Sequence, residues 1–302
     1  MSTIKNYLSL VKFSHTIFAM PFAMIGFFLA VLHPAMQWQP DTGIPAGWQQ
    51  WLLKLVLVIA CMVTARSAAM GFNRYLDRHF DALNPRTAIR EIPAGIISAD
   101  NALWFVIVNC ILFVVFAGLL NRLCLLLSPV ALFVVLGYSY TKRFTALCHI
   151  ILGIGLSLAP IGAYIAVTNR FDLLPLLFSF AVVCWVSGFD IIYAMQDEEF
   201  DRRQQLHSIP AALGKSRALR VSEFLHLLSA SFVVVAGILG VFGLWYWIGV
   251  LVFAGMLLYQ HSIVKPNDLS RVNIAFMTAN GIASVVFAVF VIIDLFRQPL
   301  SV

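Results

Sequence analysis

Long apolar stretches, each close to the length that crosses a bilayer, make up most of this sequence. About 20 consecutive apolar residues form a helix long enough to span the hydrocarbon core of a membrane. Such a segment must be helical in lipid, because every backbone N–H and C=O group then finds its partner within the segment. Only 11% of the residues are charged, whereas a soluble domain carries roughly 25%. The sequence therefore predicts an all-α, multi-pass membrane protein.

The apolar pattern predicts nine transmembrane helices in one bundle. They are expected near residues 14–33, 49–74, 99–120, 123–141, 145–168, 172–196, 217–241, 243–262 and 272–296. No linker is long enough to separate two domains, so residues 1–302 are expected to form a single transmembrane domain. The first apolar run is longer than the core of a signal peptide, and no cleavage-site pattern follows it, so it is expected to remain as the first helix.

Positive charge alternates between the loops of the two expected membrane faces. One face carries Lys5, Lys12, Arg74, Arg78, Arg86, Arg90, Lys142, Arg143, Arg202, Arg203, Lys215, Arg217, Arg220, Lys265 and Arg271. The other carries only Arg122, Arg170 and Arg297, with Lys54 near a helix end. Cytoplasmic loops are enriched in Lys and Arg, so the N-terminus is expected in the cytoplasm and the C-terminus outside. The bacterial cytoplasmic membrane is the expected location. In a membrane protein an excess of Lys and Arg reflects cytoplasmic loops, so the positive charge does not indicate a nucleic-acid partner.

A first acidic cluster follows the second apolar stretch, in GFNRYLDRHFDALNPRT (71–87). Residues spaced at i, i+4 and i+8 lie on one face of a helix. Asn73, Asp77 and Asp81 are therefore expected to point the same way, over about 12 Å of helix.

A second acidic cluster closes the sixth apolar stretch, in GFDIIYAMQDEEFDRR. Asp197 and Asp201 repeat the i, i+4 spacing, and Asp190 lies seven residues before Asp197, about two turns deeper. The first cluster leads into REIPAG and the second into HSIPAALGK. Two acidic helix ends, each followed by an Ile-Pro-Ala turn, suggest an internal pseudo-repeat.

Paired carboxylates on two facing helices suit Mg²⁺, which prefers hard oxygen ligands and usually combines one or two carboxylates with phosphate oxygens. The candidate metal ligands are Asn73, Asp77, Asp81, Asp197 and Asp201. Four carboxylates with nothing to bind would repel one another. The alternative is that both clusters are solvated helix ends, paired with neighbouring arginines.

Basic residues complete the same end of the expected bundle. Arg66 lies inside the second expected helix, two turns before Asn73, and a charge within a membrane segment indicates a functional site. The fourth expected helix ends in LGYSYTKRFT, where Tyr138 stands one turn before Lys142 and Arg143 follows. A Lys-Arg pair after a membrane helix is also typical of a topology anchor, and this alternative stays open.

In combination, these motifs resemble the UbiA superfamily of intramembrane prenyltransferases. NRYLDRHFDALNPRT resembles the first aspartate-rich motif of that family, DIIYAMQDEEFD the second, and YSYTKR its Tyr-x-x-x-Lys-Arg element. The opening VKFSHTIFAMPFA resembles the 4-hydroxybenzoate polyprenyltransferase-like branch, which includes enzymes thought to prenylate a dihydroxynaphthoate on the futalosine route to menaquinone. The resemblance covers the whole chain and implies nine helices with a cytoplasmic-side active site.

The resemblance implies transfer of a polyprenyl group from an allylic polyprenyl diphosphate to an aromatic carboxylic acid, in ubiquinone or menaquinone biosynthesis. The four aspartates and Asn73 would bind two Mg²⁺ ions that bridge the diphosphate. Candidates for the remaining diphosphate charge are Lys142, Arg74, Arg66 and Lys12. Lys12 falls where the family has a basic residue. His15 is a further candidate substrate contact, although a lone histidine near a helix start is more often structural.

Three residues are expected to act on the reacting groups. Tyr138 would offer its π face to the allylic carbocation, which an apolar bundle protects from water. Asp190 would orient or deprotonate the phenol of the acceptor. Arg143 would bind the acceptor carboxylate bidentately, a geometry that lysine lacks.

Three alternatives stay open from the residues alone. A secondary transporter also carries intramembrane charges, but it places them near mid-membrane on broken helices, whereas these acids lie at helix ends. A scaffold that binds prenyl lipids would not need two metal clusters. A prenyltransferase with a non-aromatic acceptor, such as haem or glycerol phosphate, would have little use for Arg143 and Asp190. The prenyl chain length and the choice between hydroxybenzoate and naphthoate stay open, and no obligate protein partner is evident.

Overall fold

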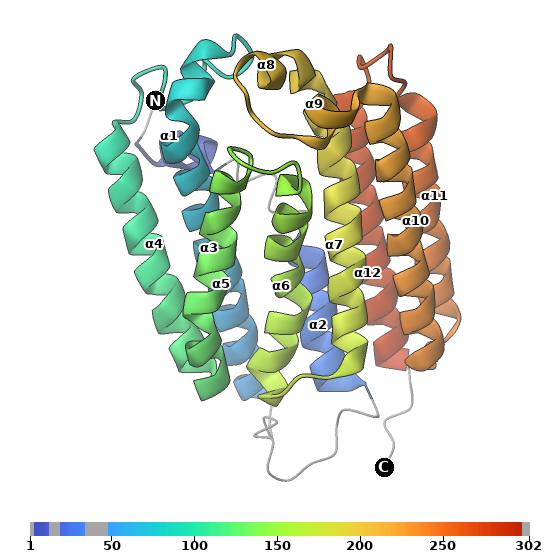
Figure 1. The fold of residues 1–302 in the computed structure, drawn as a ribbon. Coiled ribbons are helices and arrows are strands. Elements are labelled where there is room, and N and C mark those ends of the chain that lie inside the picture. Colours follow the sequence, from blue (N-terminus) through green and yellow to red (C-terminus); the bar gives the residue numbers. More distant parts are fainter. Residues whose placement is uncertain (1–2, 12–18, 34–47, 298–302) are drawn as a thin grey trace.

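Long helices that run side by side form the described part of the chain (Figure 1). The computed structural model describes residues 3–11, 19–33 and 48–297, and these residues form no β-strand. In chain order the helical elements are α1 (Thr3–Leu10), α2 (Met20–Leu32), α3 (Trp48–Leu83), α4 (Ala99–Leu120), α5 (Arg122–Thr141), α6 (Cys148–Thr168), α7 (Leu173–Ala194), a 3₁₀ turn (Met195–Asp197), α8 (Glu198–Arg203), α9 (Ile209–Leu213), α10 (Lys215–Leu239), α11 (Leu244–Ile263), a π-helical turn (Ile274–Ala279) and α12 (Asn280–Arg297). The all-α class predicted from the sequence is confirmed.

Within the described residues, eight helical segments are long and apolar enough to cross a membrane. The segment expected at 14–33 is represented by α2, which has 13 residues and carries a proline in its first turn. Residues 12–18 lie outside the described part. The multi-pass membrane class is therefore confirmed, while the expected count of nine full-length spans is one too high for the part of the chain that the structure describes.

The first acidic cluster lies on the last turns of α3 rather than after it. The predicted helix was too short, because α3 continues to Leu83 over 36 residues. Its length of about 54 Å exceeds the roughly 30 Å of hydrocarbon core, so its last turns extend beyond that core. The helix ends just before Asn84-Pro85, since the residue that precedes a proline avoids helical conformation. Asp77 and Asp81 therefore share one continuous helix, as their spacing predicted.

The second acidic cluster lies where a helix breaks. α7 ends at Ala194, the 3₁₀ turn follows, and α8 begins at Glu198. Asp197 therefore lies in the turn and Asp201 in α8, so the two acids do not share an uninterrupted helix as their spacing suggested.

Half of the bundle is tightly packed. α7 contacts α6 and α10, α11 contacts α12, and α2 lies against α6 and α12. Aromatic rings join these helices: the ring centroids of Phe22 and Trp185 lie 5.3 Å apart, as do those of Phe253 and Phe287. On the other side, α4 and α5 bury little of their surface, which leaves their apolar side chains for lipid.

Both acidic clusters lie at one end of the bundle. The C-terminal end of α3 is found there together with α1, α8 and α9, whereas α12 ends at the opposite end (Figure 1). Which end faces the cytoplasm stays a prediction from the loop charges.

α2 approaches α6 so closely that only a glycine fits at the contact. A Cβ atom on Gly26 would lie 2.0 Å from the carbonyl oxygen of Pro160, inside α6. This oxygen belongs to the backbone, so it cannot move aside as a flexible side chain would.

Gly26→Ala should therefore lower the free energy of unfolding by about 1–3 kcal/mol, because the added methyl group forces α2 and α6 apart. The measurement is the midpoint of thermal unfolding in detergent. Gly255→Ala on α11 is the matched control, since apart from its chain neighbours and the adjacent backbone of its own helix nothing lies within 4 Å of its added Cβ. Its stability should be unchanged or slightly higher, because alanine favours a helix more than glycine does. Equal losses in both variants would contradict the close contact.

Candidate active site

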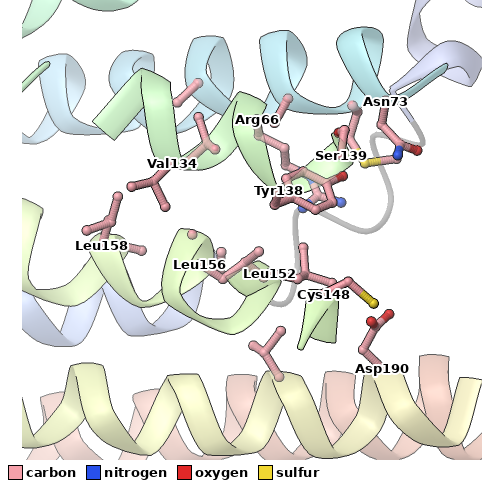
Figure 2. Close-up of a pocket in the computed structure, with 18 of the residues that line it drawn as sticks. Arg66, Asn73, Val134, Tyr138, Ser139, Cys148, Leu152, Leu156, Leu158 and Asp190 are labelled. Carbon is pink, nitrogen blue, oxygen red and sulfur yellow. The ribbon is translucent and has the colours of Figure 1, made fainter. Parts of the chain in front are cut away.

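A cavity of about 590 Å³ runs along the half of the bundle that contains α3, α5, α6 and α7. Figure 2 shows its two parts: Arg66, Asn73, Tyr138 and Asp190 gather at one end, and apolar side chains of α5 and α6 line the rest. The polar end also includes both acidic clusters. The cavity therefore suits a ligand with a charged head and a long apolar tail.

Asp77 is held by a residue of α3 and by a residue that follows α5. Asn73, one turn earlier on α3, donates from Nδ2 to Asp77 Oδ2 at 2.9 Å, and Arg143 donates from Nη2 to Oδ1 at 2.9 Å. Arg143 also donates to the carbonyl oxygens of Leu76 at 3.2 Å and Ser139 at 2.9 Å. The arginine predicted to bind the acceptor thus connects the end of α5 to the first acidic cluster.

Asp81, one turn further along α3, is buried beneath the loop that follows the helix. Arg90 donates from Nη1 to Asp81 Oδ1 at 2.6 Å, and Thr87 donates from Oγ1 to the Asp81 carbonyl oxygen at 3.1 Å. The other carboxylate oxygen, Oδ2, is buried with no hydrogen-bond partner. This oxygen is therefore available to a further ligand.

Asp197 is held by the segment that follows the first cluster. Arg86 donates from Nε to Asp197 Oδ1 at 3.1 Å and pairs through Nη2 with Oδ2, while Asn84 donates from Nδ2 to Oδ1 at 3.2 Å. Arg86 also donates from Nη1 to the hydroxyl of Tyr193 at 3.0 Å. The Asn-Pro-Arg segment after α3 thus joins the two acidic clusters.

Asp201 is the most deeply buried of the four acids, with no exposed side-chain surface. Lys142 Nζ lies 2.7 Å from Oδ1, and Ser208 donates from Oγ to Oδ2 at 2.9 Å. Burial by itself lowers the pKa of Lys142, but the carboxylates of Asp201 and Asp197 outweigh it and raise that pKa above the ordinary lysine value. Lys142 therefore carries its proton while it holds Asp201.

Each of the four aspartates has a cation of its own. The pairs are Asp77 with Arg143, Asp81 with Arg90, Asp197 with Arg86, and Asp201 with Lys142. Within the described residues, no three His, Cys, Asp or Glu side chains come together in a way that could hold a metal ion. The structure thus brings the predicted acids to one cavity, where basic side chains separate them.

Two arginines of α3 face the same cavity with unpaired nitrogens. The Nε atoms of Arg66 and Arg74 are buried and have no hydrogen-bond partner. Tyr138 of α5 lies beside Arg66 (Figure 2). Because a buried charge without a partner is costly, these two N–H groups point to an anionic ligand.

Asp190 of α7 lies across the cavity from Tyr138 and Arg66 (Figure 2). Its Oδ2 lies 2.7 Å from Nδ1 of His149, on α6. His149 was not predicted as a site residue. The only hint of it in the sequence is its position at the start of an apolar stretch.

The predicted site residues gather well. All of those within the described chain line the cavity: Arg66, Asn73, Arg74, Asp77, Asp81, Tyr138, Lys142, Arg143, Asp190, Asp197 and Asp201. Lys12 and His15 lie outside the described residues, so their roles stay predictions. Two further site residues were missed in addition to His149. Arg86 and Arg90 were predicted only as positive charges of a loop, not as residues of the site. The Asn-Pro-Arg-Thr segment was the signal that could have placed Arg86 in the site.

The chain matches known proteins over most of its length. Residues 19–282 match the UbiA prenyltransferase family. A 4-hydroxybenzoate octaprenyltransferase of Nitrosomonas europaea is 31% identical over 265 residues, which cover 85% of this chain and 90% of the relative. The apo structure of a UbiA homolog from Aeropyrum pernix K1 has a TM-score of 0.80 at 31% identity, over 93% of this chain and 98% of that one. A UbiA homolog from Archaeoglobus fulgidus bound to GPP and Mg²⁺ shares the fold, with a TM-score of 0.69 at 19% identity over 96% and 99% of the two chains.

These matches confirm the resemblance seen in the motifs, and they favour an enzyme over the transporter and scaffold alternatives. The family match covers α2 to the start of α12, so it includes every described element that lines the cavity. The chain belongs to the UbiA prenyltransferase family and is an integral membrane prenyltransferase.

Proposed function

We propose that this enzyme transfers a polyprenyl group from an allylic polyprenyl diphosphate to an aromatic carboxylic acid, either 4-hydroxybenzoate or a dihydroxynaphthoate, in quinone biosynthesis. The observation that carries the proposal is that one cavity contains four motif aspartates, several cations and a continuous apolar wall. An allylic polyprenyl diphosphate has the matching halves, a polyanionic head and an apolar tail. The name of the Nitrosomonas europaea relative supports the acceptor class.

The donor atoms at the polar end fit Mg²⁺. Carboxylate and amide oxygens are the hard ligands that this ion prefers, and Asp81 Oδ2 is a buried carboxylate oxygen with no partner. The ligands would be Asp77, Asp81, Asp197 and Asp201, with Asn73 as a neutral ligand. When bound, Mg²⁺ supplies Lewis-acid stabilisation of the departing pyrophosphate. The Archaeoglobus fulgidus homolog bound to GPP and Mg²⁺ supports this choice of ion.

The cations at this end would bind the diphosphate. Arg86 forms an ion pair with Asp197, and Lys142 forms one with Asp201. Each cation can exchange its carboxylate partner for a phosphate oxygen when the substrate binds. Arg74 is 4% exposed and its Nε has no partner, which supports a direct contact with the diphosphate. Charge-assisted N–H···O bonds to phosphate are among the strongest hydrogen bonds in proteins.

The apolar wall would hold the isoprenoid tail. On α5 it extends from Ser139 to Cys124, about 22 Å along the helix axis. Side chains such as Val134 and Leu156 line it (Figure 2), and they exclude the water that would destroy an allylic carbocation. Tyr138 lies at the boundary between the polar and apolar parts, where its ring can stabilise that cation.

The acceptor would lie between Asp190 and Arg66. Asp190 would accept the phenol proton as the aromatic ring attacks the allylic carbon. The unpaired Nε of Arg66 supports this residue as the group that binds the acceptor carboxylate. The contacts of Arg143 with Asp77 and two backbone carbonyls support a role in holding the first cluster, beside the acceptor role that its sequence position suggests.

The proposal is tested by incubating membranes that contain the protein with Mg²⁺, a polyprenyl diphosphate and each aromatic acid in turn. Mass spectrometry of the lipid extract should detect a prenylated acid, and EDTA should remove the product. Full turnover in metal-free buffer would exclude the metal site. Equal turnover of an acceptor that lacks a carboxylate would exclude the acceptor class.

Asp77→Asn and Asp197→Asn should each reduce turnover by ~100-fold or more, since metal stabilisation of a departing group contributes several kcal/mol. Turnover is measured at equal amounts of folded protein, checked by gel filtration in detergent. Glu199→Gln is the matched control, because Glu199 lies on α8 between the two acids of the second cluster but is 81% exposed. It should retain the wild-type rate. Near-wild-type rates in both aspartate variants would mean that the clusters are only solvated helix ends.

Arg66→Lys should raise the KM of the aromatic acid roughly 10- to 100-fold, the loss expected for a charge-assisted contact worth about 1.5–3 kcal/mol. A lysine recovers little, because a point charge cannot reproduce the guanidinium fork. Arg143→Lys is compared under the same conditions and should mainly lower the rate through Asp77. If Arg143→Lys instead raises the acceptor KM and Arg66→Lys does not, then the carboxylate is bound by Arg143.

A further inference from the structure

A buried histidine holds one side of the acid that faces the acceptor. Both residues line the cavity, where the side chain of His149 is 3% exposed and that of Asp190 is 25% exposed, so the histidine is the more deeply buried partner. The pair joins α6 to α7 through the 2.7 Å contact between His149 Nδ1 and Asp190 Oδ2. Oδ1 is left as the carboxylate oxygen for a ligand in the cavity.

The second ring nitrogen determines which tautomer is present. The backbone N–H of Ile209 donates to His149 Nε2 at 3.3 Å. A backbone N–H can only donate, so Nε2 is the acceptor and the ring proton resides on Nδ1. His149 Nδ1 therefore donates to Asp190, and the imidazole links a fixed backbone group to the carboxylate.

The surroundings hold this ring in place. Ser187 donates from Oγ to the backbone carbonyl of His149 at 3.1 Å, which ties α7 to the start of α6. One turn further along α6, a Cβ on Gly153 would lie 2.5 Å from both Ser187 Oγ and the Val183 carbonyl oxygen. The two helices thus contact each other directly at this level, so His149 has little freedom to move relative to Asp190.

The chain of contacts continues to the second acidic cluster. Ile209 follows Ser208, whose Oγ donates to Asp201 Oδ2 at 2.9 Å. The same segment is fixed to α5, because His207 N donates to the Lys142 carbonyl oxygen at 2.7 Å. The position of His149 therefore depends on the segment that covers Asp201.

We propose that His149 is a positioning residue for the acceptor half of the reaction: it orients the Asp190 carboxylate toward the acceptor and ties it to the segment beside Asp201. The inference rests on the proposed function, in which Asp190 accepts the phenol proton. A buried histidine that only stabilises the fold would affect both substrates alike. A positioning residue affects the acceptor and leaves the prenyl diphosphate site intact.

Two variants separate these roles. His149→Phe keeps the ring and removes both nitrogens. In His149→Asn the side-chain amide can occupy the place of Nδ1 and still donate to Asp190. His149→Phe should lower kcat/KM for the aromatic acid roughly 10- to 100-fold, the loss typical of partners that orient a functional group. The KM of the prenyl diphosphate should stay within about twofold, and His149→Asn should recover most of the lost rate.

A double-mutant cycle tests whether His149 acts through Asp190. In an Asp190→Asn background, with its residual rate followed over long incubations, His149→Phe should cause little further loss. His226→Asn is the matched control, because His226 is equally buried, bonds the Trp185 carbonyl oxygen and does not line the cavity. It should lower the thermal midpoint without changing the acceptor KM or kcat.

Several outcomes would overturn the inference: equal losses for both substrates, no recovery in His149→Asn, or full additivity with Asp190→Asn. If His149→Phe does not accumulate, His149→Gln replaces it, because its amide can take the place of Nε2 but offers no donor at Nδ1. A wild-type enzyme that prenylates no aromatic acid would defeat the proposed function. A wild-type enzyme that does so, with an unchanged acceptor kcat/KM in the His149 variants, would defeat only the positioning role.

Discussion

The arrangement of the polar end of the cavity depends on one interaction, the pairing of each motif aspartate with a basic side chain. The four cations come from two places: Arg86 and Arg90 from the segment after α3, and Lys142 and Arg143 from the end of α5. The pairs therefore connect α3, α5 and the segment after α7 around one opening. Removal of one partner would leave a largely buried charge without compensation, which costs several kcal/mol.

The same arrangement makes the polar end complementary to a metal–diphosphate complex, because its acids suit the metal and its bases suit the phosphates. Electrostatic interactions are stronger beside an apolar cavity than in water, since the effective dielectric constant is lower there. The packed aromatic core of α2, α7, α11 and α12 lies next to the half of the bundle that contains the cavity and supports it. The rigid half thus positions Asp190, while α4 and α5 present their outer faces to lipid.

Much of this could be predicted from the sequence. The i, i+4, i+8 spacing correctly placed Asn73, Asp77 and Asp81 on one helix. The structure brings both acidic clusters to one cavity. Helix boundaries were less predictable. Hydropathy reports where a chain is apolar, so it missed the polar continuation of α3 to Leu83 and the break after Ala194. The short α2 also departs from the expected first span.

The sequence by itself determined the membrane class, the helical fold and the two acidic clusters, because these depend on hydropathy and periodicity along neighbouring residues. The family followed from the resemblance of the motifs. Only the tertiary structure decided which side chains meet. Arg86 and Asp197 are 111 residues apart in sequence, and His149 and Asp190 are 41 apart. Their contacts depend on how α3 and its following segment, α6 and α7 lie against one another. A local pattern carries no information about that packing, because the helices could be arranged in many ways with the same apolar faces.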